Sequence, residues 1–297
     1  MKPVLFSVSY AGLWGQDALG LEEFVRHAAG LGYEGVELMG KRPHLSPLDW
    51  SPDACRELGE TCVHAGVEVS CVAAYTNFSG GAEAAEVPFG EMQVAYVERL
   101  SQMAEALGCE LVRVFTAYER PDMPPGEVWR RTVAGLQECC DRAAEFGVTI
   151  GVQNHHDLAV HSKALLELLR EVDRDNCALM FDPWSVCLRG EDPAEAAREM
   201  APHAVYTTLA DYLRLPRYQY QPELVNYRRV PEDLARAVPM GEGDMANAEF
   251  IAALREGGFD GPIAYEMCSP LRGGGSRENL DFCARRFLEW LSEHNFG

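Results

Sequence analysis

Four segments of this chain share a pattern that points to chemistry: each is a short apolar run that ends in a polar residue. The runs cover 149–153, 178–182, 204–208 and 263–266, and they end in Gln153, Asp182, Thr208 and Glu266. If the runs are parallel strands of one barrel, their last residues ring the same mouth. Two carboxylates, an amide and a hydroxyl placed together predict a site for one divalent ion, because such ions take carboxylate and carbonyl oxygens as ligands.

The elements that must position this ring alternate regularly along the chain. The other expected strands are 4–8, 35–38, 67–72 and 111–115, and the expected helices are 19–31, 52–65, 89–107, 126–146, 161–173, 192–201, 247–257 and 276–293. Eight strand–helix units predict an α/β fold, a (β/α)8 TIM barrel, as a single domain over 1–297 with a long loop after the seventh strand. A doubly wound sheet is the alternative, but no G-x-G-x-x-G follows a strand.

Composition narrows the classes of partner. The net charge of −20 argues against nucleic acid and anionic membrane surfaces, which attract basic proteins. No run approaches the roughly 20 apolar residues of a membrane helix, and the N-terminus lacks a signal-peptide pattern. The ten cysteines are scattered without a C-x-x-C pair, which indicates reduced thiols and predicts a cytoplasmic location.

Five short motifs occur in a fixed order along the chain. They are GYEGVEL at 32–38, QNH at 153–155, FDP at 181–183, MGEGDM at 240–245 and GFDGPIAYE at 258–266. With these motifs the chain resembles, over nearly its whole length, the sugar-phosphate isomerase/epimerase superfamily, also called xylose-isomerase-like TIM barrels. The resemblance is specific for the superfamily and not for the substrate.

The resemblance implies a metal site and a type of reaction. In that family a Glu, an Asp, a His and a Glu on strands 5 to 8 hold one divalent ion, and the two Glu residues act as acid and base on a ketose or aldose. Asp182 and Glu266 match this pattern. Gln153 stands where the family has Glu, and Thr208 stands at the position of the His.

The chemistry expected at this site is proton transfer. Mn²⁺ is the expected ion, with Mg²⁺, Zn²⁺ and Co²⁺ as alternatives, and His155 joins the ligands if the strand extends that far. The ion would polarise a sugar carbonyl so that an enediolate forms, with Glu266 as the base. Gln153 has no ionisable proton, so His155 or His156 is the expected second catalytic group, titrating near neutral pH. Substrate hydrogen bonding or loop packing is the alternative for the histidines.

Further residues near the expected mouth are candidates for holding the substrate. They are Glu37, Lys41, Arg42, His44, Arg113, Asn154, Trp184, Thr208, Asp211 and Arg272. Arg113 lies inside an apolar strand and needs a partner, either Glu37 or the substrate. Residues 41–44 form a basic cluster or a solvated loop. Trp184 offers a ring for a sugar or caps the core, and Arg272 begins an Arg-Gly-Gly-Gly run that cradles an anion or is a flexible turn.

The segment 210–246 is long for a loop in a compact domain and is rich in Tyr and Arg. Long loops of this kind are usually functional, so we expect it to close over the ligand as a lid. The alternative is an arm that contacts another subunit, and a homo-oligomer stays open.

The sequence leaves three functions open. The first is a metal-dependent isomerase or epimerase of a sugar, keto-sugar or inositol, with a small-molecule sugar as substrate. The second is a metal-dependent lyase or dehydratase on an oxidised sugar. The third is a non-catalytic barrel that binds a sugar or a partner protein.

Overall fold

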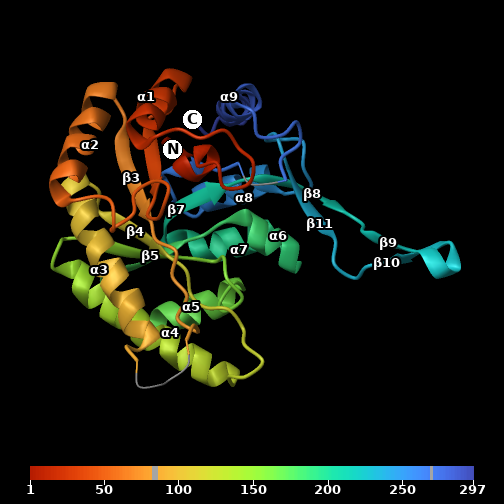
Figure 1. Cartoon of the computed structure of the whole chain (residues 1–297), viewed down its shortest axis with the longest axis horizontal. Coiled ribbons are helices and arrows are strands. Elements are labelled where there is room, and N and C mark those ends of the chain that lie inside the picture. Colours follow the sequence, from red (N-terminus) through yellow and green to blue (C-terminus); the bar gives the residue numbers. More distant parts are fainter. Residues whose placement is uncertain (82–85, 268–269) are drawn as a thin grey trace.

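Parallel strands close into a barrel in the computed structural model, which describes residues 1–81, 86–267 and 270–297. The barrel strands are β1 (Pro3–Phe6), β2 (Gly35–Met39), β3 (Glu68–Ala73), β4 (Leu111–Val114), β5 (Thr149–Gln153), β6 (Cys177–Met180), β7 (Ala204–Leu209) and β12 (Ile263–Tyr265). Neighbours in the barrel follow sequence order, and β12 pairs with β1 to close it. The predicted (β/α)8 barrel is confirmed (Figure 1).

Helices surround the barrel, and most of them match the expected ranges. They are α1 (Leu21–Leu31), α2 (Pro52–Ala65), α3 (Phe89–Leu107), α4 (Pro125–Ala144), α5 (Ser162–Val172), α6 (Pro183–Arg189), α7 (Pro193–Met200), α8 (Asn247–Glu256) and α9 (Arg277–Glu293), with 3₁₀ turns at Ser7–Tyr10, Ala201–His203 and Pro222–Leu224. The helix α6 was not expected. It begins at Pro183, a residue whose fixed φ suits the first helical position, and this start shortens the preceding strand.

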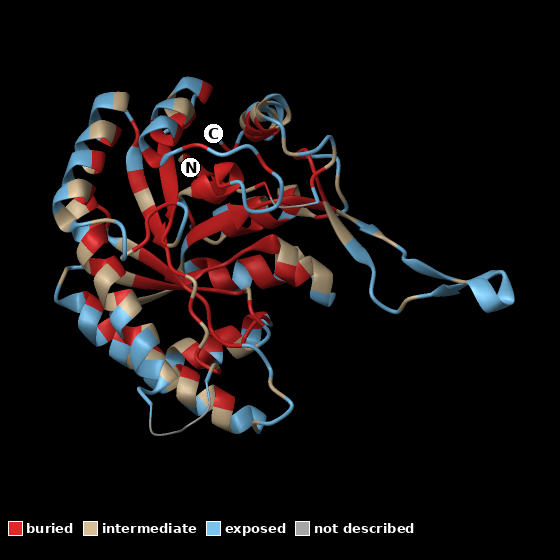
Figure 2. Ribbon diagram, in the orientation of Figure 1, coloured by how far each residue is buried: buried red, intermediate tan, exposed pale blue. Residues whose placement is uncertain are grey.

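Apolar side chains fill the barrel below its mouth. Val4, Cys71, Met180, Tyr206 and Ala264 form one buried cluster from five different strands. A much larger cluster lies between the strands and the helices, and Figure 2 shows the barrel strands buried along almost their whole length. Burying one such side chain contributes about 1.5–3 kcal/mol, so the barrel is a rigid frame for the residues at its mouth.

The segment after β7 forms two antiparallel ribbons. Strand β8 (Asp211–Leu215) pairs with β11 (Leu234–Val238), and β9 (Tyr218–Gln221) pairs with β10 (Asn226–Arg229). Figure 1 shows the β9–β10 ribbon extending away from the barrel. The expectation that this segment closes over the ligand as a lid stays a prediction, and in this structure the ribbon is extended.

No described helix is long and apolar enough to cross a membrane. The nine cysteines in the described ranges are free thiols, most of them buried. Cys268 lies outside the described residues.

Candidate active site

The predicted ring of polar residues lies at the C-terminal ends of neighbouring strands. Gln153 ends β5, Thr208 lies near the end of β7 and Glu266 follows β12 directly. Asp182 follows β6 by two residues and is the N-cap of α6, so the sixth strand is shorter than predicted. Gln153, Asp182 and Thr208 are buried, and Glu266 is partly exposed.

A chain of hydrogen bonds links Arg113 to three residues of the predicted ring. The Nη1 atom of Arg113 donates to Oε1 of Gln153 at 2.9 Å. The amide Nε2 of Gln153 donates to Oδ2 of Asp182, and the backbone N–H of Thr208 donates to Oδ1 of Asp182 at 2.7 Å. Both carboxylate oxygens of Asp182 and the amide oxygen of Gln153 therefore each accept a hydrogen bond.

Arg113 has the charged partner that its place in an apolar strand requires. Its Nη1 lies 4.0 Å from Oε1 of Glu37, and both side chains are buried. The guanidinium also packs against aromatic rings, with its Cζ 4.2 Å from the ring centroid of Phe115 and 5.3 Å from that of Phe6. Contacts of this kind stabilise a desolvated cation. The prediction that Arg113 meets Glu37 is confirmed.

Glu37 accepts a second contact from a residue that sequence reasoning missed. The hydroxyl of Tyr206 donates to Oε2 of Glu37 at 3.2 Å. Tyr206 precedes Thr208 by two positions on β7, and side chains two apart on a strand share a face. That spacing was the signal that could have placed Tyr206 inside the barrel.

Burial makes two of the mouth carboxyl groups weak acids. It raises the pKa of Glu37 to about 8, although Arg113 acts in the opposite direction. It raises the pKa of Asp182 to about 7, against the lowering effect of the hydrogen bonds from Thr208 and Gln153. The charge of Glu266 raises both pKa values further. Three carboxyl groups thus share one mouth, and two of them exchange protons near neutral pH.

Two cations flank the ring of Tyr75, which follows β3. The Nζ atom of Lys41 lies 3.7 Å from the ring centroid and the Cζ atom of Arg113 lies 4.9 Å from it. Burial lowers the pKa of Lys41, and the charge of Arg113 lowers it further. Lys41 therefore belongs with the mouth cluster, as the sequence predicts.

The two histidines leave the strand and pack together. The N–H of His155 donates to the carbonyl of Gln153 at 2.9 Å, so the chain turns at once after β5. The Nδ1 atoms of His155 and His156 are 3.1 Å apart, and both rings lie against Phe115. Burial lowers the pKa of His155 to about 3 and that of His156 to about 4. The expected titration near neutral pH is therefore wrong, and both rings are neutral at pH 7.

Asn154, directly after β5, and Trp184, in the first turn of α6, lie beside the site. The Nδ2 of Asn154 donates to the carbonyl of Asp182 at 3.0 Å, and its Oδ1 accepts the N–H of Asp182 at 2.8 Å. Asn154 thus connects the end of β5 to the start of α6. The ring of Trp184 lies 5.3 Å from that of His155 and 5.8 Å from that of Tyr212.

Two of the predicted substrate residues in the basic cluster have other partners. Exposed Arg42 donates two hydrogen bonds to Asp49 at 2.6 Å. His44 is buried, with its ring nitrogens 3.1 Å from the hydroxyl of Ser7 and the carbonyl of Leu19. Assigning Arg42 and His44 to the substrate is corrected, because their side chains hold the loop after β2 in place.

The assignment of Asp211 and Arg272 to the substrate is also corrected, because both side chains have partners within the protein. Oδ2 of Asp211 accepts the N–H groups of Gly241 and Gly243, each at 2.9 Å, and a Cβ at Gly243 would overlap with Oδ1 of Asp211. Arg272 forms an ion pair with Glu242. These contacts fix the turn that returns the chain from the ribbon to the barrel.

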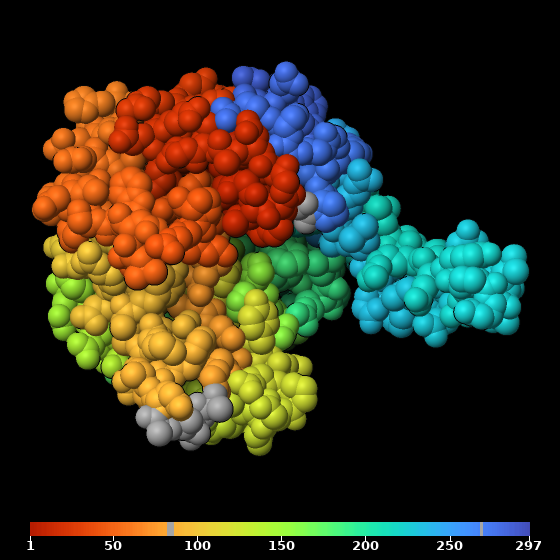
Figure 3. Space-filling model, in the orientation of Figure 1, coloured from red at the N-terminus to blue at the C-terminus, as the bar shows by residue number. Residues whose placement is uncertain are grey.

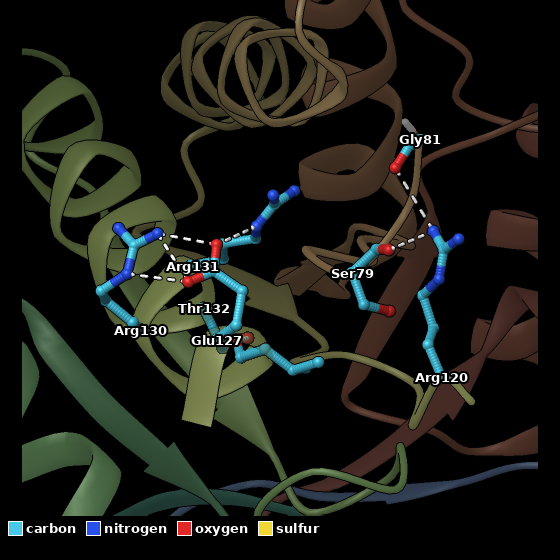
Figure 4. A network of polar contacts seen from close by, with 8 residues as sticks. Ser79, Gly81, Arg120, Glu127, Arg130, Arg131 and Thr132 are labelled. Carbon is cyan, nitrogen blue, oxygen red and sulfur yellow. Dashed lines mark hydrogen bonds and ion pairs between the residues drawn. The ribbon is translucent and has the colours of Figure 1, made fainter. Parts of the chain in front are cut away.

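The loops after β3 and β4 are tied to each other beside the mouth. Nη1 of Arg120 donates to the carbonyls of Ser79 at 2.8 Å and Gly81 at 3.3 Å. In the first turn of α4, Glu127 accepts hydrogen bonds from Arg130 and Arg131, both at 2.7 Å (Figure 4). The contacts of Arg120 connect the loops after β3 and β4, whereas those of Glu127 stay within α4.

The mouth residues do not fit the divalent ion that the resemblance implies. Among the described residues, no group of three or more carboxylate, imidazole or thiol side chains is placed to hold a metal ion. The carbonyl of Gln153 is taken by Arg113, and its amide group faces Asp182. Thr208 adds only a neutral hydroxyl. A dication here would also lie near a buried guanidinium, and like charges repel strongly where water is excluded.

The closed barrel and the carboxyl groups at its C-terminal mouth define a class of α/β barrel enzymes and binding proteins. The sequence matches the model of the xylose isomerase-like TIM barrel family over residues 25–286, and the chain belongs to this family.

Sequence similarity to curated relatives is local. Inosose dehydratase of Lacticaseibacillus casei is 26% identical over 139 residues, which are 46% of each chain. The uncharacterized protein YihM of Escherichia coli K12 is 25% identical over 119 residues, which are 40% of this chain and 35% of that protein. The match thus spans less than half the length of these relatives.

Similarity to solved structures covers the whole chain. D-psicose 3-epimerase, in a crystal structure with D-fructose, has a TM-score of 0.76 at 16% identity over 100% of both chains. The probable 3-DHS dehydratase AsbF of Bacillus anthracis has a TM-score of 0.73 at 19% identity over 98% of this chain and 99% of that one. At such identities the likeness establishes the shared fold.

Proposed function

We propose that this chain is an enzyme that moves a proton at the carbon beside the carbonyl group of a polyhydroxylated substrate, such as a keto-sugar or an inosose. Isomerisation or epimerisation is the leading reaction. One observation carries the proposal: Glu37, Asp182 and Glu266 share the barrel mouth with the buried guanidinium of Arg113. Two carboxyl groups with different pKa values at one site commonly serve as the general acid and the general base of an enzyme.

The carboxyl groups take different roles because their burial differs. Glu266 is the least buried of the three and is the proposed base that removes the proton. Asp182, whose pKa is about 7, holds a proton for part of the time at neutral pH and is the proposed acid. A catalytic group works best with a pKa near the working pH.

Positive charge at the mouth would stabilise the negative oxygen that forms in the reaction. Arg113 and Lys41, which both lie against the ring of Tyr75, supply this charge, and fixed charges in a water-poor site stabilise a developing oxyanion. The hydroxyl of Thr208 is buried without a hydrogen-bond partner in the described part of the chain, which leaves it for a substrate oxygen. The proposal needs no Mn²⁺ or other divalent ion, since the donor set does not fit one.

Dehydration is the second candidate. In that reaction Glu266 would take the α-proton while Asp182 protonates the departing hydroxyl, so that a carbon–carbon double bond forms and water leaves. The local similarity to inosose dehydratase favours it. The neutral Gln153 also favours dehydration over a two-base epimerisation, since an amide cannot act as a second base.

Solvent-proton exchange tests the proposal on several classes of candidate substrate with one readout. The purified chain would be incubated in D₂O with ketohexoses, ketopentoses and inososes, and the products followed by proton NMR. We expect loss of the α-proton signal for at least one compound. New sugar signals would identify an isomerase or epimerase, and an unsaturated product would identify a dehydratase.

Matched variants separate catalysis from folding in this assay. Glu266→Gln should abolish the exchange, whereas Arg42→Ala, at the loop after β2, should retain it. Binding of a sugar by the wild-type chain without exchange into any compound would overturn the proposal and identify a non-catalytic binding barrel.

A further inference from the structure

We propose that the β9–β10 ribbon is an arm that binds the acidic barrel of a second copy of this chain, so that the protein is a dimer joined by its arms. The arm is defined as residues 214–229. The proposal is independent of the proposed reaction, because it concerns residues outside the mouth cluster.

The arm exposes apolar side chains that nothing in its own chain covers in the described structure. Tyr218 is 62% exposed, Val225 79% and Tyr227 66%. The rings of Tyr220 and Tyr227 pack against each other across the two strands at 5.1 Å. Figures 2 and 3 show the arm extending clear of the barrel.

An arm of this kind needs a partner to be stable. Strands β9 and β10 pair only with each other within the described chain, and an isolated two-stranded ribbon is marginally stable at best in water. Apolar side chains gathered on an extended element mark a protein contact more often than a free surface. The exposed tyrosines and Val225 of the arm are therefore not buried in any core formed by the described chain.

The difference in charge between the arm and the rest of the chain favours a second copy of this chain as the partner. The arm carries Arg214, Arg217, Arg228 and Arg229 against Glu223. Glu232 and Asp233 follow it closely, and Asp233 pairs with Arg229. The arm and its base are therefore weakly basic, while the whole chain has a net charge of −20. A basic arm and an acidic barrel on the same molecule are complementary between two copies. In a two-fold dimer each arm makes the same contact, so the contact forms twice and closes the assembly.

Sedimentation velocity over a range of protein concentrations and salt tests the proposal. We expect a dimer for the wild-type chain, weakened by salt because screening reduces the attraction between exposed charges. Replacing residues 218–229 by Asn-Gly should give a monomer. Arg217→Glu with Arg228→Glu should raise the dimer dissociation constant by about tenfold or more.

The control is Arg56→Glu on helix α2, which changes the net charge by half as much as the paired variant and should leave the dimer intact. Far-ultraviolet circular dichroism would verify that each variant folds, and the paired arginine variant tests the arm without shortening the chain. A wild-type chain that is monomeric at all concentrations would overturn the proposal, and so would a deletion variant that stays dimeric.

Discussion

Arg113 and Gln153 are joined by a 2.9 Å hydrogen bond, and this contact decides which way the amide of Gln153 faces. Because the guanidinium only donates, it must meet the carbonyl oxygen of the amide. The NH₂ group of Gln153 then faces Asp182 and donates to it. A glutamine at this position is therefore matched to its two neighbours, and a glutamate would not be.

Gln153→Glu should destabilise the protein, since the new carboxylate would face Asp182 without a hydrogen to donate. We expect a loss of about 1–3 kcal/mol in the free energy of unfolding at pH 8, the usual cost of a buried polar group left without its partner. Urea unfolding would measure it. Recovery of the lost stability on addition of Mn²⁺ would contradict this account, because it would show that a carboxylate here completes a metal site.

Chelation should leave the wild-type protein unchanged. The donor set does not fit a divalent ion, so dialysis against EDTA is expected to alter neither the melting temperature nor the rate of α-proton exchange. Metal analysis of the purified protein and calorimetric titration with Mn²⁺ would accompany the test. A stoichiometric metal content, lost together with activity on dialysis, would restore the metal-dependent mechanism.

Arg113→Met should lower kcat/KM by about 100-fold or more, the size of effect seen when a group that stabilises a developing charge is removed. The variant should also lose stability, because Gln153 and Glu37 lose a buried partner. Adding Glu37→Gln should restore part of the stability and none of the activity. Recovery of both in the double variant would mean that Arg113 has only a structural role.

The stability of the protein should fall as the pH rises from about 6.5 to 9. Glu37 has a folded-state pKa raised to about 8, so its contribution is complete below its unfolded pKa and is lost as the pH passes through 8. Asp182, raised to about 7, acts in the same direction. His155 and His156 have lowered pKa values in the folded protein. They are neutral in both states above about pH 7.5, so they add no slope there, and between about pH 6.5 and 7.5 they oppose the fall only slightly.

Glu37→Gln should flatten that pH dependence. Each unit of pKa shift corresponds to about 1.4 kcal/mol, so removing the acid should reduce the fall above about pH 6.5 by about 2 kcal/mol. Thermal unfolding at several pH values would show it, with Arg42→Ala as a control that keeps the wild-type slope. An unchanged slope in Glu37→Gln would mean that Glu37 is ionised in the folded protein at neutral pH.

Asp182→Asn and Glu266→Gln should each reduce proton exchange by at least about 100-fold while leaving the circular dichroism spectrum unchanged. Both replacements keep the size of the side chain and remove its ability to transfer a proton. Full activity in both variants would place the chemistry elsewhere. Strong loss in Glu266→Gln alone would identify a reaction that needs a single base.

The sequence by itself determined the barrel and the location of its mouth. Apolar runs, helical periodicity and glycines after helices are local signals, and they predicted the order of strands and helices with small errors at the ends. The sixth strand was expected to run to Asp182, but Pro183 starts a helix and makes Asp182 its N-cap. The larger error was in 210–246, which was expected as a loop and contains the strands β8 to β11. Because all barrel strands run in parallel, naming the last residue of each strand was enough to name Gln153, Thr208 and Glu266 as neighbours.

Only the tertiary structure decided how these residues are used. Tyr206 and Glu37 are separated by 169 positions in the sequence and meet because the barrel closes. The pKa values of Glu37 and His155 depend on burial and on charges from other strands, which no local pattern records. The direction in which residues 214–229 extend was also not readable from the sequence. An antiparallel ribbon has the same pattern of residues whatever its orientation relative to the barrel.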